Sequence, residues 1–181
     1  MIAGLYGIVD PTSGDPEAQA HLLAEEGVFP IQLRCKGWTR DEVRRLALRC
    51  RGLSASLIIN DDAVLAAELG LVAHLGDGDG AALGKHGRST HTLEQVRAQR
   101  GALYIGFGPV FPTATKSLPW APRGLDLLAA AVRESTRPVV AIGGIGPENI
   151  DGVRATGAAG WAVVGAIWRS SDPRAVIRSL R

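Results

Sequence analysis

Residues 138–150 read PVVAIGGIGPENI, a short run of branched apolar residues followed by two glycines and then by a proline and an acid. The apolar run predicts a buried strand, because it is short and rich in Val and Ile. Gly143 and Gly144 predict a tight turn after the strand, and Pro147 with Glu148 predicts the start of a helix. This order is typical of α/β proteins, in which backbone amides at such a turn can bind a phosphate.

The same unit of strand and helix repeats along the chain at nearly constant spacing. The predicted strands are Leu5–Val9, Pro30–Arg34, Leu57–Asn60, Leu71–Leu75, Gly87–Thr90, Leu103–Phe107, Pro138–Ile142 and Trp161–Val164. The predicted helices are Pro16–Glu26, one that Thr39 caps and that carries Cys50, Ala63–Leu69, Thr92–Gln99, Leu125–Glu134 and Pro173–Leu180. This alternation predicts a parallel sheet, and the eight strands predict one α/β domain, a (β/α)8 TIM barrel over residues 1–181.

The middle of this barrel is predicted to be shortened around the fourth helix and the fifth strand. Gly87–Thr90 contains no branched apolar residue that could fill a core. Only the ten residues from Asp79 to Arg88 separate the HLGDG segment at the end of the fourth strand (74–78) from Ser89. Because a crossover between parallel strands takes about a dozen residues or more, the fourth helix should be nearly absent.

The composition excludes several classes of partner. Apolar residues make up 46% of the 181 residues, charged residues 21%, and the formal charge is +2, which is too weakly basic to indicate nucleic-acid binding. No apolar run approaches the roughly 18–20 residues that span a bilayer, and the N-terminus lacks the basic segment of a signal peptide. Cys35 and Cys50 have no metal-binding spacing. We therefore expect a cytoplasmic protein with reduced thiols and no membrane partner.

Polar residues and glycines follow the predicted strands at their carboxyl ends, where barrels of this class carry their reactive groups. These residues are Gln32, Arg34, Lys36, Asn60, Asp61, Asp79, Ser89, His91, Thr113, Thr115, Lys116, Gly143, Gly144, Val164 and Gly165. Asp61 and Asp79 could hold a hard cation through oxygen ligands. The basic members of the set could neutralise a diphosphate beside that cation, and the hydroxyl groups could donate to phosphoryl oxygens.

Each of these residues has a simpler structural interpretation. Asp61 could cap the third helix, Asp79 could be only a turn residue, and isolated Lys and Arg side chains are usually solvated. His74 is flanked by apolar residues, which favours a hydrogen-bonded core histidine, whereas a structural and a catalytic role are equally compatible with His91. Capping and turn roles do not require the whole set to meet at one rim, so the convergence favours a site.

At these residues the sequence resembles the thiamine phosphate synthase family. The matching stretches occur in family order over nearly the whole chain: LYGIVD (5–10), IQLRCK (31–36), IINDD (58–62), HLGDGD (74–79), GRSTHT (87–92), YIGFGPVFPTATK (104–116) and AIGGI with its PEN turn (141–149). The resemblance implies an enzyme that joins 4-amino-5-hydroxymethyl-2-methylpyrimidine diphosphate to a thiazole phosphate, giving thiamine phosphate and pyrophosphate, with Mg²⁺ as cofactor. It also suggests a homodimer.

The resemblance also implies a role for each site residue. Mg²⁺ would be bound by Asp61 and Asp79. Gln32 would hydrogen-bond the aminopyrimidine ring. The pyrophosphate group would be held by Arg34, Lys36, Asn60, Ser89 and Lys116, of which the charged residues and Ser89 would act in catalysis. The thiazole phosphate would be bound by Thr113, Thr115, Gly144 and the amides of Val164 and Gly165.

Two departures from the family pattern leave alternatives open. Gly165 stands where the family commonly has Ser, and the segment 79–89 is shorter than in typical members. A thiazole tautomerase on the same fold would use His91 to move protons, but such relatives read GHVF where this chain reads GPVF. A non-catalytic regulator that binds thiamine precursors stays possible on the fold alone, but both carboxylates, Lys36 and Lys116 are retained, which argues against an eroded site. A phosphosugar isomerase that shares the glycine turn would have no need for the diphosphate half of the set.

Overall fold

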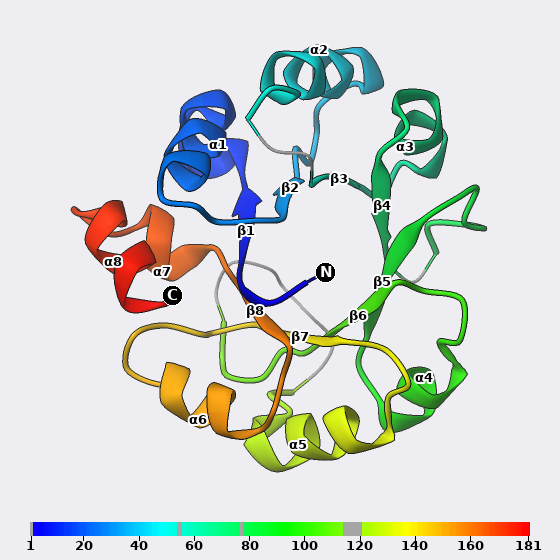
Figure 1. Cartoon of the computed structure of the whole chain (residues 1–181), viewed down its shortest axis with the longest axis vertical. Helices are drawn as coiled ribbons and strands as arrows, with labels where there is room; N and C mark the ends of the chain where they lie inside the picture. The colour runs from blue at the N-terminus through cyan, green and yellow to red at the C-terminus, as the bar shows by residue number, and fades with distance from the viewer. Residues whose placement is uncertain (1, 54–55, 77, 114–120) are drawn as a thin grey trace.

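The computed structural model describes residues 2–53, 56–76, 78–113 and 121–181, and within these ranges eight parallel strands close into a barrel in sequence order. The helices form a ring outside the strands (Figure 1). The strands are β1 Gly4–Val9, β2 Ile31–Leu33, β3 Leu57–Asn60, β4 Val72–Leu75, β5 His86–Thr90, β6 Tyr104–Phe107, β7 Val139–Ile142 and β8 Gly160–Val163. The helices are the 3-10 turn Pro11–Ser13, α1 Pro16–Glu25, α2 Arg40–Cys50, α3 Ala63–Leu69, α4 Leu93–Ala98, α5 Gly124–Glu134, α6 Ile150–Ala155, α7 Gly165–Trp168 and α8 Pro173–Ser179. The predicted fold is confirmed.

The connection from β4 to β5 has no helix among its described residues, as the short spacing predicts. Arg88 holds this connection instead. Its Nη1 donates to the carbonyl oxygen of Gly76 at 2.9 Å, and its Nη2 donates to that of Gly80 at 3.4 Å. A charged side chain on the strand thus substitutes for the packing that a helix would provide.

Side chains alternate between two packing layers because successive residues of a strand point to opposite faces. One layer is a small cluster inside the barrel, formed by Tyr6, Ile8, Ile58, Tyr104, Val140 and Ala162. The other is the larger layer between the strands and the helices, which includes Leu33, Ile59, Leu75, Phe107 and Ile177. The helices therefore pack on a closed wall whose interior is filled separately.

The fifth strand lacks branched apolar residues because a neighbouring ring occupies their space. Gly87 pairs with Tyr104 of β6 in the strand register. A Cβ atom on Gly87 would lie 2.1 Å from Cζ of Tyr104, which is a severe clash. The glycine at position 87, one part of the weak strand signal, thus has a steric origin.

Two features of the C-terminal segment went unpredicted. The first is α7, a single turn directly after β8, which the indole of Trp168 fixes by donating to the carbonyl oxygen of Ile8 at 2.8 Å. The second is the closure of the helix ring, where α8 lies beside α1 (Figure 1). There the buried carboxylate of Glu26 accepts hydrogen bonds from Arg174 at 2.8 Å and from Arg178 at 2.8 and 2.9 Å.

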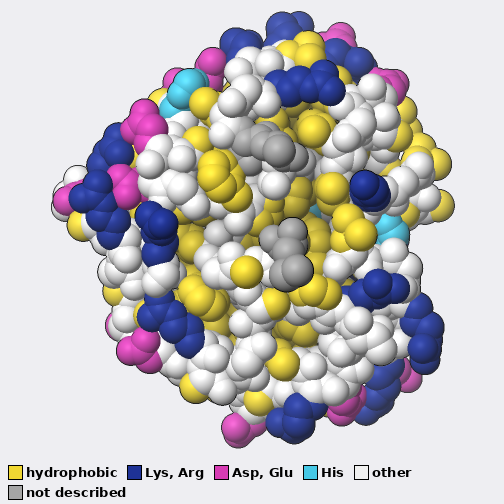
Figure 2. Space-filling model, viewed as in Figure 1, with side chains coloured by type: hydrophobic (Ala, Val, Ile, Leu, Met, Phe, Trp, Pro, Cys, Tyr) yellow, Lys and Arg dark blue, Asp and Glu magenta, His cyan; other side chains and the backbone are white. Residues whose placement is uncertain are grey.

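Elsewhere on the ring, ion pairs join neighbouring helices: Arg49 to Glu17, Arg44 to Glu68 and Arg97 to Glu134. On the face drawn in Figure 2, charged side chains of both signs lie around the edge and apolar side chains gather toward the centre.

In the described part of the chain, no helix is both long and apolar enough to cross a bilayer. The two cysteines are free thiols, both buried.

We expect Glu26→Gln to destabilise the barrel at neutral pH. The hydrogen bonds from Arg178 and Arg174 lower the pKa of Glu26 from 4.5 to about 2. A lowered pKa means that the charged form stabilises the fold above pH 4.5, and that this stabilisation is lost as pH falls toward 2. Urea unfolding of the wild type and the variant should show a difference in free energy that narrows over this window.

Glu25→Gln is the matched control, because Glu25 pairs with Arg174 but is exposed. Its effect should be smaller, as is usual for exposed pairs. If the difference in unfolding free energy between the wild type and Glu26→Gln stayed constant from pH 7 to pH 2, the interpretation would be wrong.

Candidate functional site

A cavity of about 350 Å³ opens at the carboxyl ends of the strands. It brings together residues from β1, β5, β7 and β8 and from the segments that follow β2 and β6. The sequence-predicted members of its lining are Arg34, Ser89, His91, Thr113, Gly143, Gly144, Val164 and Gly165. A second cavity of about 180 Å³, lined by Lys36, Asn60 and Asp61, lies between the ends of β2 and β3. The predicted residues that line a cavity therefore form two groups.

Asp61 is held in a strained turn at the end of β3. Its φ is 64°, in the left-handed region, which Asp tolerates better than most residues. The amide of Asp62 donates back to the carbonyl oxygen of Asn60 at 2.8 Å, and the amide of Asp61 donates to that of His74 at 2.8 Å. This three-residue turn is of the uncommon strained type. Strain of this kind at a carboxylate supports a functional interpretation.

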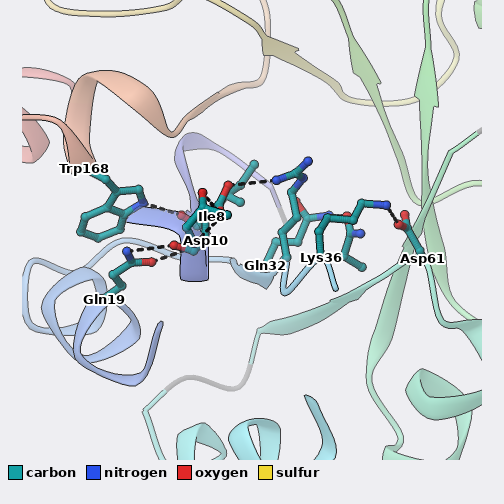
Figure 3. Close-up of polar contacts among 10 residues, drawn as sticks. Ile8, Asp10, Gln19, Gln32, Lys36, Asp61 and Trp168 are labelled. Carbon is teal, nitrogen blue, oxygen red and sulfur yellow. Dashed lines mark hydrogen bonds and ion pairs between the residues drawn. The ribbon is translucent and has the colours of Figure 1, made fainter. Parts of the chain in front are cut away.

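Asp62, and not Asp61, caps the N-terminus of α3. The side chain of Asp62 accepts from the amide of Leu65 at 2.9 Å, which makes Asp62 the N-cap of α3. Asp62 also pairs with Arg40. Asp61 instead forms an ion pair with Lys36, as Figure 3 shows. The carboxylate of Asp61 is thus not needed to begin the helix.

Asp79 approaches Asp61 from the turn after β4. Burial raises the pKa of Asp79, the amide of Gly76 lowers it by donating to the carboxylate, the Asp61 carboxylate raises it, and Lys36 lowers it. The net direction is upward. The two carboxylates repel each other, and this repulsion disfavours the charged form of Asp79. Among the described residues, no cluster of three or more His, Cys, Asp or Glu side chains forms a metal site.

Arg34 is oriented by a residue to which the sequence assigned no role. Its Nη1 donates to Oδ2 of Asp10 at 2.9 Å, and Asp10 is buried with 3% of its surface exposed. Gln19 of α1 brackets the backbone of Asp10, accepting from its amide at 2.8 Å and donating to its carbonyl oxygen at 3.2 Å (Figure 3). The position of Asp10 at the end of the first strand was the signal that could have identified it.

Gln32 lies deeper than the other predicted residues. Its side chain is 3% exposed and donates through Nε2 to Oδ1 of Asn60 at 3.1 Å. Neither Gln32 nor Asp79 lines either of the two cavities. Thr115 and Lys116 lie outside the described residues.

The glycine turn after β7 packs against the loop after β6. Gly143 and Gly144 have φ of 101° and 66°, and a Cβ on Gly144 would lie 2.4 Å from the carbonyl oxygen of Pro112. The predicted helix start at Pro147 is wrong, because residues 147–149 form a turn and α6 begins at Ile150. Asn149 fixes this turn by accepting from the amide of Gly146 at 3.0 Å and donating to the carbonyl oxygen of Gly144 at 2.9 Å.

Two backbone segments of the predicted phosphate site line the larger cavity. They are the turn at residues 143–144 and the start of α7 at Gly165. Barrels of this class often bind phosphate between the loops after strands seven and eight and a short extra helix. Arg169, to which the sequence pattern assigned no role, also lines this cavity.

The two histidines of this region have different partners. His91 lines the larger cavity, and its Nδ1 lies 2.6 Å from the carbonyl oxygen of Gly108. His74 is hydrogen-bonded inside the barrel to Tyr104 at 2.8 Å and to Ser89 at 2.9 Å. His74 is thus hydrogen-bonded, as predicted, but it is half-buried.

A family model and the curated relatives point to the same family. A family described as thiamine monophosphate synthase matches residues 5–167. The chain is 40% identical to the thiamine-phosphate synthase of Anaeromyxobacter dehalogenans, covering 96% of this chain and 84% of that protein. It is 39% identical to the thiamine-phosphate synthase of Nitrosococcus oceani, covering 99% and 92%. The thiamine phosphate pyrophosphorylase structure from Pyrococcus furiosus superimposes with a TM-score of 0.82 at 29% identity, covering 98% of this chain and 93% of that one.

Gly144→Ala should deform the glycine turn, and Gly70→Ala is its matched control. Both glycines have φ of 66°, but a Cβ on Gly70 meets nothing within 4 Å. The control should lose roughly 1–2 kcal/mol for the left-handed conformation alone. Gly144→Ala should lose more in urea unfolding, and it should also weaken binding of inorganic phosphate in calorimetry. Equal losses in the two variants would show that the turn can relax.

Proposed function

The chain belongs to the thiamine monophosphate synthase family, and from this premise we propose how its site performs the reaction. The enzyme is a transferase that joins 4-amino-5-hydroxymethyl-2-methylpyrimidine diphosphate to a thiazole phosphate and releases pyrophosphate. The observation that carries the proposal is the meeting of Asp61, Asp79 and Lys36 beside a cavity lined by Arg34 and Ser89. We treat residues 1–181 as one catalytic domain.

The residues at the ends of β3 and β4 fit Mg²⁺. Asp61 and Asp79 supply carboxylate oxygens, which are ligands of the type that Mg²⁺ prefers, and their repulsion decreases when a cation lies between them. Two protein carboxylates suffice, because Mg²⁺ usually keeps several waters and binds substrate phosphates. When bound, the ion would neutralise charge on the diphosphate. Lys36, which pairs with Asp61, would then be available to the diphosphate.

The leaving group is the part of the substrate that most needs stabilisation. In a dissociative displacement the C–O bond to pyrophosphate breaks first, so negative charge builds on the diphosphate oxygens. Arg34 and Lys36 supply positive charge there, and Ser89 supplies a hydroxyl group. Asp10 keeps the guanidinium of Arg34 in place, so that little reorganisation is needed as the charge develops. Lys116 is proposed to act with them.

The second substrate captures the resulting methylene cation through its ring nitrogen. We propose that its phosphate binds to the amides around Gly144 and Gly165, with Thr113 and Thr115 as hydroxyl donors. The larger cavity has room for such a ligand, with apolar walls from Ile8, Ile142 and Ala162. Gln32, near Asn60, is proposed to recognise the pyrimidine. Exclusion of water by these walls would protect the cation until the ring nitrogen reaches it.

A thiazole tautomerase is the second candidate, because His91 lines the same cavity as the proposed thiazole site. Such an enzyme would not need the paired carboxylates, which favours the synthase. The homodimer and the cytoplasmic location stay predictions.

Replacing either carboxylate should remove the synthase activity. With both substrates and Mg²⁺, the wild type should release pyrophosphate, and Asp61→Ala and Asp79→Ala should each lower kcat by roughly 100-fold or more. EDTA should have the same effect on the wild type. Asp62→Asn is the matched control, because asparagine caps a helix as well as aspartate does and removes a neighbouring charge. Undiminished turnover in EDTA would overturn the role of the metal.

His91→Ala distinguishes the two candidate functions. The synthase reaction needs no proton transfer at this residue, so its kcat should change by less than about tenfold. A tautomerase would lose its general base and about 100-fold or more in rate. Product analysis by liquid chromatography, with the thiazole phosphate alone and with both substrates, measures the two activities separately.

A further inference from the structure

Four polar side chains form a continuous hydrogen-bonded chain through the interior of the barrel. The hydroxyl groups of Tyr6 and Tyr104 lie 2.7 Å apart. Nδ1 of His74 lies 2.8 Å from the hydroxyl of Tyr104, and Nε2 of His74 lies 2.9 Å from Oγ of Ser89. Ser89 lines the larger cavity. The chain therefore connects a fully buried tyrosine to the wall of the proposed active site.

The strand register makes this contact possible. His74 of β4 pairs with Gly87 of β5, and Gly87 pairs with Tyr104 of β6. Because Gly87 has no side chain, the rings of His74 and Tyr104 meet across it, with centroids 5.6 Å apart.

The buried end of the chain determines the direction of its hydrogen bonds. Within the described part of the protein, Tyr104 is the one hydrogen-bond partner found for the hydroxyl of Tyr6. Burial raises the pKa of Tyr6 and of Tyr104, so both phenols keep their protons. If Tyr6 did not donate to Tyr104, its proton would be buried without an acceptor, which is costly. Tyr104 then donates to Nδ1 of His74.

We propose that His74 is a positioning residue that makes the hydroxyl of Ser89 a donor toward an anionic group in the cavity. With Nδ1 accepting from Tyr104, neutral His74 carries its proton on Nε2 and donates it to Oγ of Ser89. The proton of Ser89 is then free to point into the cavity. Phosphoryl oxygens only accept hydrogen bonds, so this polarity suits a diphosphate. The inference rests on the proposed function, in which Ser89 binds the diphosphate.

The same geometry could belong to a serine nucleophile. The position of the His74 proton distinguishes a nucleophilic Ser89 from a Ser89 that only donates a hydrogen bond. An imidazole that activates a serine accepts the hydroxyl proton. In the direction derived above, Nε2 of His74 is already protonated and cannot do so. His91 provides an internal contrast, because its Nδ1 faces a carbonyl oxygen and must carry the proton.

The first test reads the proton position directly. Two-bond ¹H–¹⁵N correlation spectra of the unliganded protein, labelled with ¹⁵N-histidine, should show His74 protonated on Nε2 and His91 protonated on Nδ1. His74→Gln assigns the signal by its loss. A proton on Nδ1 of His74, or on both of its nitrogens, would overturn the proposal.

The second test measures binding of inorganic pyrophosphate with Mg²⁺ by calorimetry. His74→Leu should weaken binding roughly tenfold, since it leaves the Ser89 proton undirected. His74→Gln, whose amide can still donate at the position of Nε2, should restore most of the affinity. Tyr104→Phe removes the donor to Nδ1 of His74 and should also weaken pyrophosphate binding. This variant keeps the test valid if His74→Leu does not fold. His86→Gln, at the opposite end of β5, is the control and should bind normally.

A double-mutant cycle separates positioning from general damage. In a Ser89→Ala background, His74→Leu and Tyr104→Phe should cause no further loss of pyrophosphate affinity. Losses that persist there would overturn the proposal. If Ser89→Ala itself binds pyrophosphate as the wild type does, the role of Ser89 in the proposed function fails instead. The KM for thiazole phosphate should change little in any of these variants.

Discussion

Closure of the parallel strands is the constraint on which the rest of this protein depends. It brings every strand's carboxyl end to one rim, so residues far apart in the sequence meet there, such as Arg34, Ser89 and Gly165. It also sends alternate side chains inward, which gives the barrel a separate internal layer. The site and the buried hydrogen-bonded chain are both products of this alternation, because Ser89 and His74 point inward from neighbouring strands.

Electrostatic repulsion is built into the rim and is only partly relieved by the protein. Asp61 and Asp79 are close enough for one to raise the pKa of the other, and Lys36 offsets this repulsion. On the β2 side, Asp10 keeps Arg34 paired. Lys36 and Asp61 thus form a pair that an incoming cation or diphosphate would rearrange, whereas Arg34 stays paired with the buried Asp10.

Local sequence patterns were sufficient for the elements but not for contacts between distant residues. Apolar runs and caps such as Thr39 predicted the barrel, and the spacing from Asp79 to Arg88 predicted the missing helix. The sequence could not reveal that Arg88 bonds to Gly76, that Asp10 orients Arg34, or that α7 follows β8, because each depends on strand register or on a turn too short for periodicity. The fifth strand also depends on a contact between distant residues. Gly87 is needed there because the ring of Tyr104, on the neighbouring strand, occupies the space of a side chain.

The link between β4 and β5, whose described residues contain no helix, is a site where the barrel could accept an insertion. Its residues 80–81 and 83–85 are exposed, and Arg88 fastens the start of the link to β5 through the carbonyl oxygen of Gly76. Because the entropy of closing a loop grows slowly with length, by about 0.6 kcal/mol per doubling, this link could accept extra chain at small cost to stability. A reporter peptide or a whole foreign module could be grafted at residues 83–85, the part of the link farthest along the chain from Asp79.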